Sequence, residues 1–285
     1  MDSIHVIVED KIPFIRGVLD PFCRVSYLPA DRIDAAAMSD ADALITRTRT
    51  RCDAALLDAS PCRFIATATI GTDHIDLDYC RRRGITVANA PGCNAPAVAQ
   101  WVLASALTLR SDDPRTLTMG IVGVGHVGRQ LAQWASQLGY RLMLCDPPRA
   151  CKEGGAGFST LDEIARQADI ITFHTPLTRS GDDATYHLGG EEFFSSLKRR
   201  PLVMNAARGG VMDTHAAIRA IELGQVSAMA IDTWEGEPSI NHTLLQFADI
   251  ATPHIAGYSM MGKVRATAMA LNAFTQHFHL QALAP

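Results

Sequence analysis

One short stretch constrains the fold more than any other: residues 123–128 read Gly-Val-Gly-His-Val-Gly and stand between an apolar run and a helical pattern. Glycines at this spacing permit a tight turn after a strand, close approach of a pyrophosphate and close packing of a helix on the strand. A second predicted strand ends at Cys145 and is followed by Asp146, 18 residues after Gly128. A carboxylate there accepts hydrogen bonds from ribose hydroxyls. The pattern predicts a dinucleotide site formed by Gly123, Gly125, His126, Val127, Gly128 and Asp146.

Asp146 also bears on which nicotinamide cofactor fits this site. Its negative charge would repel the additional 2′-phosphate of NADP, so the sequence predicts NAD as the cofactor. Arg149 follows three residues later and could offset part of that repulsion. We therefore expect a preference for NAD rather than complete exclusion of NADP.

Short apolar runs alternate with helical patterns along most of the chain. The central and C-terminal part holds six candidate strands, with helical segments such as 127–138, 161–167 and 215–223 between them. These strands are expected at residues 120–122, 142–145, 170–173, 202–205, 228–231 and 250–252. Six parallel strands with crossover helices are typical of a doubly wound, Rossmann-type sheet. We predict an α/β NAD-binding domain of this type at residues 93–258.

The N-terminal part shows the same alternation on a smaller scale. Its strands are expected at residues 4–8, 43–46, 64–67 and 87–88. Thr72 and Asp73 are expected to cap a helix that runs toward Arg83. The pattern indicates a second parallel α/β unit.

The last helical segment decides how the two parts are connected. Residues 259–280 form an amphipathic pattern, and this helix would return to pack on the N-terminal part. We therefore predict a discontinuous, flavodoxin-like substrate domain made of residues 1–92 and 259–285. Hinges are expected near residues 89–92 and 255–258.

Another helical stretch, at residues 95–109, is apolar on nearly all sides. A helix without a polar face must be covered either by the protein's own core or by a second subunit. We expect a subunit interface here and therefore a homodimer, with burial in the core as the alternative.

Composition excludes several classes of function. The 285 residues include 26 Lys and Arg and 30 Asp and Glu, a formal net charge of -4 without a dense basic cluster. This balance gives no attraction to nucleic acid or to an anionic membrane. The seven cysteines form no C-x-x-C pair, so we expect neither a disulfide framework nor a metal site. Neither a signal peptide nor a membrane span is expected, and we predict a cytoplasmic protein.

Three polar residues, Arg208, Glu237 and His254, each follow a different predicted strand. Ligands bind at the carboxyl ends of strands in open α/β sheets. Singly, the three could be a surface charge, a helix-start acid and a capped loop residue. Together they could hold a substrate carboxylate with a guanidinium, take the proton of a C2 hydroxyl with an imidazole and orient that imidazole with a carboxylate. Behind a dinucleotide fold, they predict oxidation of a 2-hydroxy acid.

Further motifs carry a resemblance to a known family. They are ATIGTDHID at residues 68–76, APGCNA at 90–95, LCDPPRA at 144–150, FHTPL at 173–177 and TPHIAGY at 252–258. With the glycine-rich stretch, they resemble the D-isomer-specific 2-hydroxyacid dehydrogenases over essentially the whole chain. Within that family, the CDPPR and PGCN blocks are most similar to members that act on 4-phosphoerythronate.

The resemblance implies roles for individual residues. It makes Arg208 and Glu237 active-site residues and His254 the proton donor in the reducing direction. Contacts with NAD are implied for Asp146, Thr175, Ala206, Ala207, Arg208, Asp232 and Gly257. Contacts with substrate are implied for Thr48, Thr69 and Tyr258.

The resemblance also implies a reaction. Members of this kind oxidise 4-phospho-D-erythronate to 2-oxo-3-hydroxy-4-phosphobutanoate in the synthesis of pyridoxal 5′-phosphate, and they continue into a C-terminal dimerisation domain. Residues 46–51 alternate threonine and arginine, and if extended they would present one hydroxyl-rich and one basic face, which suits a phosphorylated polyol acid. A solvated edge strand is the structural alternative.

Two other functions stay open at the level of sequence. One is another D-2-hydroxyacid dehydrogenase, acting on 3-phosphoglycerate or on glycerate and hydroxypyruvate. The other is an NAD(H)-sensing binding protein, because corepressors reuse this scaffold. Only turnover separates an enzyme from such a sensor.

Overall fold

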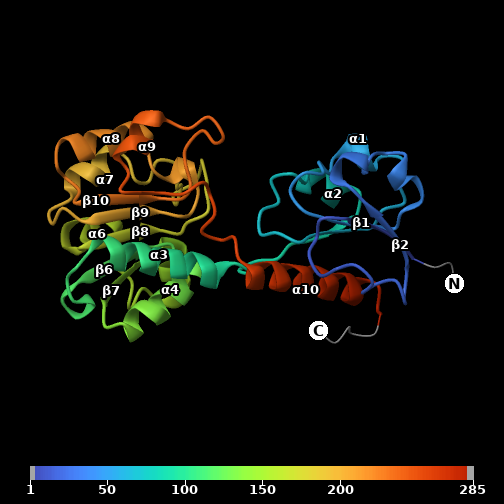
Figure 1. The fold of residues 1–285 in the computed structure, drawn as a ribbon, viewed down its shortest axis with the longest axis horizontal. Coiled ribbons are helices and arrows are strands. Elements are labelled where there is room, and N and C mark those ends of the chain that lie inside the picture. Colours follow the sequence, from blue (N-terminus) through green and yellow to red (C-terminus); the bar gives the residue numbers. More distant parts are fainter. Residues whose placement is uncertain (1–3, 281–285) are drawn as a thin grey trace. The chain divides into compact units, whose positions relative to one another are not determined.

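Short apolar segments fold into two parallel sheets in the computed structural model, which describes residues 4–280. Each sheet belongs to its own structural unit (Figure 1). One unit holds the described residues up to Asn94 and those from Ser259 onward, and the other runs from Ala95 to Tyr258. All strand pairs within the two sheets are parallel, so the predicted α/β class is confirmed.

The first unit contains a five-stranded sheet in the order β2-β1-β3-β4-β5. Its strands are β1 His5–Glu9, β2 Arg24–Leu28, β3 Ala43–Thr46, β4 Phe64–Thr67 and β5 Thr86–Ala88. Its helices are α1 Ala54–Leu57, α2 Leu77–Arg82 and α10 Met260–His277, with the short 3-10 helices η1 Ala30–Arg32 and η2 Ala37–Asp40. The strand order reverses between β1 and β3.

Both faces of this sheet are buried. In β1, Val6 and Val8 pack on the side of α10, whereas Ile7 packs on the opposite side, with α1 and α2. The rings of Phe64 in β4 and Phe274 in α10 meet edge to face, with centroids 5.9 Å apart. Burial on both faces explains why the central strands β1, β3 and β4 are mostly apolar.

The second unit contains a six-stranded sheet in the order β11-β10-β9-β8-β6-β7. Its strands are β6 Thr118–Val122, β7 Arg141–Cys145, β8 Ile170–Phe173, β9 Leu202–Asn205, β10 Ala228–Ile231 and β11 Ile250–Ala251. Its helices are α3 Ala95–Leu109, α4 His126–Gln137, α5 Pro147–Glu153, α6 Leu161–Gln167, α7 Glu191–Ser196, α8 Thr214–Glu222 and α9 His242–Phe247, with η3 Pro114–Thr116 and η4 Gly209–Val211. The six predicted strands are confirmed, and their order reverses between β6 and β8, as in doubly wound sheets.

Helices cover both faces of the second sheet. On one face, Val102 of α3 and Leu131 of α4 join a buried cluster with Ile121 of β6. On the other face, Ile164 of α6 joins a cluster with Phe173 of β8 and with residues of α7 and α8. Because helices cover both faces of the sheet, polar side chains are carried by the loops at the carboxyl ends of the strands.

Helix α3 is covered in part by its own unit. Ala99, Val102 and Ala106 are buried against α4 and the sheet, whereas Leu107 is 48% exposed. The core alternative therefore accounts for one side of the helix. A subunit interface on the exposed side stays a prediction.

The structure corrects three local predictions in the first unit. Strand β2 forms where the sequence predicts none. Its pattern is not recognisable as a strand, because β2 lies at the sheet edge, is only partly buried and includes polar residues. The predicted cap at Thr72 and Asp73 is wrong, since α2 starts later and Asp76 accepts the capping hydrogen bond from Tyr79 N at 2.8 Å. Residues 46–51 are not extended beyond the end of β3, and β3 is a central strand rather than an edge strand.

No helix within residues 4–280 is both long enough and apolar enough to cross a membrane. Helix α3, which is strongly apolar, packs on the second sheet.

Candidate active site

The glycine-rich stretch connects β6 to α4. Gly123 has a φ of 91°, and a Cβ at this position would lie 2.6 Å from the backbone of His174. A Cβ on Gly128 would lie 2.1 Å from the carbonyl oxygen of Gly123, whereas Gly125 has nothing within 4 Å of its Cβ position. The first and third glycines thus permit the turn and the helix packing, and the second leaves the backbone open to a ligand.

A cavity of about 790 Å³ lies beside this turn and is lined by the ends of β6 and β7 and by the loops that follow β6, β7 and β8. Gly123, Gly125, Asp146 and Thr175 are among its lining residues. Two buried atoms at this place, Thr175 Oγ1 and His174 Nδ1, have no hydrogen-bond partner in the described part of the chain. Cavities of this size hold small molecules, and the unpaired atoms indicate a polar one.

The start of helix α4 supplies a second feature that fits a dinucleotide. The helix begins at His126 and Val127 without a side-chain cap on Gly125. Its first amide groups therefore have no partner within the helix, and they form a favourable site for an anion such as a pyrophosphate. The residues present fit the predicted cofactor.

Asp146 closes one side of the cavity and is tied to the glycine turn. Its Oδ2 accepts a hydrogen bond from Val124 N at 2.8 Å, and its Oδ1 accepts one from Arg149 N at 3.1 Å. The Arg149 side chain donates to both carboxylate oxygens of Glu153, each at 2.8 Å, and to Val124 O at 2.6 Å. Hydrogen bonding by Arg149 also holds the pKa of Glu153 below its usual value. Because Glu153 and Val124 O hold the Arg149 guanidinium, it offsets less of the negative charge of Asp146 than its nearness to Asp146 in the sequence indicates.

This geometry makes cofactor choice testable with Asp146→Asn. The amide oxygen can still accept from Arg149 N, but the charge that repels a 2′-phosphate is gone. We expect the affinity for NADPH relative to NADH to rise about tenfold, roughly 1.4 kcal/mol. Fluorescence titration with both reduced cofactors measures the ratio, with the exposed Asp162→Asn as the control. An unchanged ratio would show that Asp146 does not select the cofactor.

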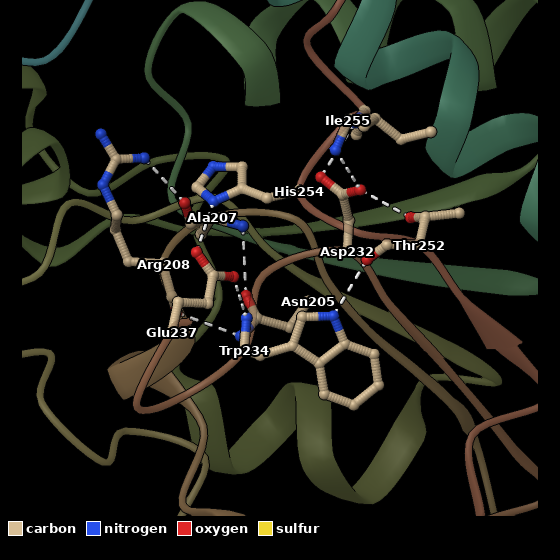
Figure 2. A network of polar contacts seen from close by, with 10 residues as sticks. Asn205, Ala207, Arg208, Asp232, Trp234, Glu237, Thr252, His254 and Ile255 are labelled. Carbon is tan, nitrogen blue, oxygen red and sulfur yellow. Dashed lines mark hydrogen bonds and ion pairs between the residues drawn. The ribbon is translucent and has the colours of Figure 1, made fainter. Parts of the chain in front are cut away.

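A second cluster of polar residues lies at the carboxyl ends of β9, β10 and β11, which are neighbours in the sheet. Figure 2 shows Arg208, Glu237 and His254 together with the groups that hold them. His254 Nδ1 lies 2.8 Å from Glu237 Oε2, and Glu237 Oε1 accepts a hydrogen bond from Trp234 N at 2.7 Å. The structure thus joins His254 and Glu237 as the sequence predicts. Both line a cavity of about 430 Å³.

Asp232 builds the turn that presents His254. Its buried carboxylate accepts hydrogen bonds from Thr252 Oγ1 at 2.6 Å, Ile255 N at 2.7 Å and Ala256 N at 2.9 Å. Its backbone oxygen accepts from His254 N at 2.8 Å. These bonds hold His254 in a left-handed backbone conformation with a φ of 54°, which residues with side chains seldom adopt. Gly257 follows this turn, and the predicted NAD contacts of Asp232 and Gly257 stay predictions.

Arg208 stands on a second tight turn, after β9. The buried side chain of Asn205 donates to Arg208 O at 3.1 Å and accepts from Ala207 N at 3.1 Å. The exposed guanidinium donates to Ala207 O at 2.8 Å, and within residues 4–280 it forms no ion pair. Ala206 is partly buried and Ala207 is buried. A cation held without a carboxylate partner is available to an anionic substrate.

The residues implied to contact substrate come from both units. In the first unit, Thr48 is exposed in the loop after β3, and Thr69 lies after β4 with its hydroxyl 2.7 Å from that of Thr67. In the second unit, Tyr258 is 68% exposed. The two faces predicted for residues 46–51 do not form, because the chain bends at 48–50 and buries Thr50.

His174 had no role in the sequence analysis beyond its place in the FHTPL motif. Its Nε2 lies 2.9 Å from Thr172 Oγ1. Burial lowers the pKa of His174 from 6.5 to about 3, because desolvation disfavours the imidazolium. The ring therefore stays neutral in the folded protein, whereas it takes up a proton in the unfolded chain below about pH 6.5.

This difference predicts a loss of stability in acid. The contribution of neutral His174 to the free energy of unfolding is fully present above the pKa of histidine in the unfolded chain. It is lost as the pH falls from there toward the lower pKa of His174 in the folded protein. Between about pH 7.5 and 5, the free energy of unfolding should fall by about 2 kcal/mol from this group alone. Urea unfolding of the protein and of His174→Asn at both pH values measures it, with the exposed His215→Asn as the control. Equal pH dependence in the protein and in His174→Asn would contradict it.

Comparison with known proteins tests what this geometry means. A family model described as "D-isomer specific 2-hydroxyacid dehydrogenase, NAD binding domain" matches residues 95–256, nearly the whole second unit. The chain belongs to this family. It is an NAD-dependent dehydrogenase, and the predicted cofactor and class of enzyme are confirmed.

Relatives of this dehydrogenase carry a more specific name. An erythronate-4-phosphate dehydrogenase from Bacteroides thetaiotaomicron is 48% identical, over 98% of this chain and 81% of that protein. One from Porphyromonas gingivalis is 46% identical, over 98% of this chain and 76% of that protein. A D-lactate dehydrogenase from Aquifex aeolicus, solved with NAD and lactic acid, shares the fold, with a TM-score of 0.76, 24% identity and coverage of 96% and 95% of the two chains.

Proposed function

We propose that this dehydrogenase oxidises C2 of 4-phosphoerythronate with NAD. The observation that carries the proposal is the contact of His254 with Glu237 at 2.8 Å. Glu237 follows β10 and His254 follows β11, and β10 lies between β11 and β9, the strand that precedes Arg208. The substrate is the one named in relatives at 46–48% identity. The reaction removes the hydroxyl proton and the hydrogen of C2, and it leaves a 2-oxo acid.

His254 is assigned the proton. Since Glu237 Oε2 is a carboxylate oxygen, the nitrogen facing it, Nδ1, carries the hydrogen, and the Nε2 lone pair stays available. In oxidation, Nε2 takes the proton of the C2 hydroxyl and returns it in the reducing direction. Glu237 fixes this tautomer and stabilises the imidazolium that forms.

Arg208 is assigned the substrate carboxylate. A planar guanidinium can donate two parallel hydrogen bonds to the two carboxylate oxygens, which fixes the adjacent C2. The turn held by Asn205 and the absence of an ion pair within residues 4–280 support this assignment. Orientation of C2 is the part of catalysis that this residue supplies.

The cofactor is assigned to the 790 Å³ cavity. NAD held there would supply the acceptor for the hydrogen of C2 and its electron pair. The start of α4 would hold the pyrophosphate and Asp146 the ribose hydroxyls, while Thr175 offers an unpaired hydroxyl. Residues 206–208, Asp232 and Gly257 are the further proposed contacts.

The phosphate of the substrate needs donors of its own. Thr48, Thr69 and Tyr258 are the proposed contacts with substrate. Arg49 is exposed in the same loop as Thr48 and forms no ion pair within residues 4–280, so it is a cation available to a phosphate.

We further propose a homodimer, a place in pyridoxal 5′-phosphate synthesis and a reducing, cytoplasmic compartment. All seven cysteines are free, and six are buried.

A substrate panel tests the proposal. We expect kcat/KM with NAD to be highest for 4-phosphoerythronate when it is compared with erythronate, 3-phosphoglycerate, glycerate and D-lactate. A regenerating acceptor keeps the reduced cofactor from accumulating. Equal or higher kcat/KM for another acid of the panel would assign a different 2-hydroxy acid, and no turnover of any of them would contradict the proposed activity.

A further inference from the structure

His187 occupies an unusual position between two carboxylates of the second unit. Its Nε2 lies 2.6 Å from Glu235 Oε1, and its Nδ1 lies 3.0 Å from Asp213 Oδ2. Its backbone is left-handed, with a φ of 55°. Nε2 is hydrogen-bonded to Glu235 and Nδ1 lies within ion-pair distance of Asp213, so the ring stands between two acidic side chains.

The groups around this ring are few. Tyr186 stacks on it with centroids 3.9 Å apart, and the guanidinium of Arg179 lies 4.1 Å from the centre of the Tyr186 ring on the same loop. The His187 side chain is 29% exposed. The two carboxylates are the acidic groups in contact with the ring.

Each carboxylate is anchored to a different active-site loop. Glu235 is two residues before Glu237, and its Oε2 accepts from Thr214 N at 3.3 Å. Burial acts to raise the pKa of Glu235, but hydrogen bonds from His187 and Thr214 outweigh it and lower the pKa. Asp213 caps α8 through its Oδ1, which accepts from the amides of the first helical turn at 2.8 and 2.9 Å. It follows η4, the 3-10 helix that begins directly after Arg208.

The two loops are in direct contact with each other. A Cβ on Gly209 would lie 1.9 Å from Trp234 O and 2.4 Å from Glu235 N, so the segment after Arg208 packs against the backbone of the Glu237 loop. The His187 segment is bonded to the same place, since His187 N donates to Gly210 O at 2.8 Å. His187 thus lies where the two loops meet.

We propose that His187 is a positioning residue for the reaction: through its hydrogen bond to Glu235 and its ion-pair contact with Asp213, it fixes the loop of Glu237 against the loop of Arg208. The inference rests on the roles proposed for Arg208, Glu237 and His254. Without His187, two carboxylates face each other without a donor between them, and their repulsion separates the loops. Glu237 then no longer holds His254 Nδ1 at its present distance.

His187→Gln tests this proposal, with His215→Gln, an exposed histidine of α8, as the matched control. We expect kcat to fall about tenfold in His187→Gln, because small displacements of catalytic groups are costly, while the Kd of NADH stays within about twofold of the unmodified value. The acidic limb of the kcat/KM profile should move to lower pH, because imidazolium at His254 loses its carboxylate. His215→Gln should match the unmodified enzyme in each measurement.

Glu235→Gln supplies a second test. It removes one of the two facing charges, so the double variant His187→Gln/Glu235→Gln should recover activity relative to His187→Gln, and the two losses should not add. If the losses of kcat in the two single variants add in the double variant, and the acidic limb of the kcat/KM profile does not move, His187 is only a structural residue and the proposal is overturned. The proposal is also overturned if His187→Gln behaves like His215→Gln in every measurement.

The same measurements separate this proposal from the proposed function. An unmodified enzyme that turns over none of the acids in the panel overturns the function and this inference with it. An unmodified enzyme that is active, on any acid of the panel, supports the reaction class, and the ratio of its activity to that of the variants then decides about His187 alone.

Discussion

His254→Ala is expected to lower kcat for the oxidation about 10²- to 10⁴-fold, the range over which general acid–base groups act. The physical reason is the loss of the Nε2 base, which Glu237 holds in one tautomer from 2.8 Å on the Nδ1 side. The Kd of NADH should stay nearly unchanged, because the cavity assigned to the dinucleotide is lined by the ends of β6 and β7 and by the loops that follow β6, β7 and β8.

Steady-state rates and NADH titration measure the two effects separately. His242→Ala is the matched control, since His242 is exposed at the start of α9. Glu237→Gln should give an intermediate loss, because it keeps a hydrogen-bond acceptor but removes the charge that stabilises the imidazolium. Unchanged turnover in His254→Ala would reject His254 as the acid–base group.

Arg208→Ala carries the second large effect. It should lower kcat/KM on the order of 10²- to 10³-fold, since two charge-assisted hydrogen bonds to the substrate carboxylate are lost. Arg208→Lys should recover only a small part, because an ammonium group cannot donate in the same planar, paired geometry. Added guanidinium should restore part of the activity of Arg208→Ala, since it can occupy the space of the missing side chain.

The control for this series is Arg166→Ala, a surface arginine paired with Asp162 in α6. It should leave kcat and KM unchanged. A normal KM and kcat in Arg208→Ala would mean that another group holds the carboxylate. If Arg208→Ala lowers the free energy of unfolding but not the activity, Arg208 stabilises the turn after β9 and does not bind the substrate.

Much of the fold follows from local sequence. Strands β3, β4, β8, β9 and β10 begin and end where the apolar runs predict, because strands buried on both faces consist almost wholly of apolar residues. Strand β2 could not be found in this way, since an edge strand that is half exposed carries no such run. The bend at 48–50 was missed because alternation of threonine and arginine is compatible with several backbone conformations.

The site was predictable where topology alone brings residues together. Parallel strands end at one edge of a sheet, so residues after β9, β10 and β11 had to be neighbours, and His254 and Glu237 are in contact. The contacts of Asn205 with its own turn, and above all that of His187 with Glu235, 48 residues apart, depend on how loops fold. No periodicity or spacing in the sequence reports such contacts.

The most direct test of the central claim uses 4-phosphoerythronate that carries deuterium at C2. If the C2 hydrogen passes to NAD while His254 takes the proton of the C2 hydroxyl, the deuterium should be found on the nicotinamide ring of the reduced cofactor, and His254→Ala should slow its appearance about 10²- to 10⁴-fold at the same cofactor occupancy. Reduced cofactor without deuterium, or equal transfer in the His254→Ala variant, would contradict the account.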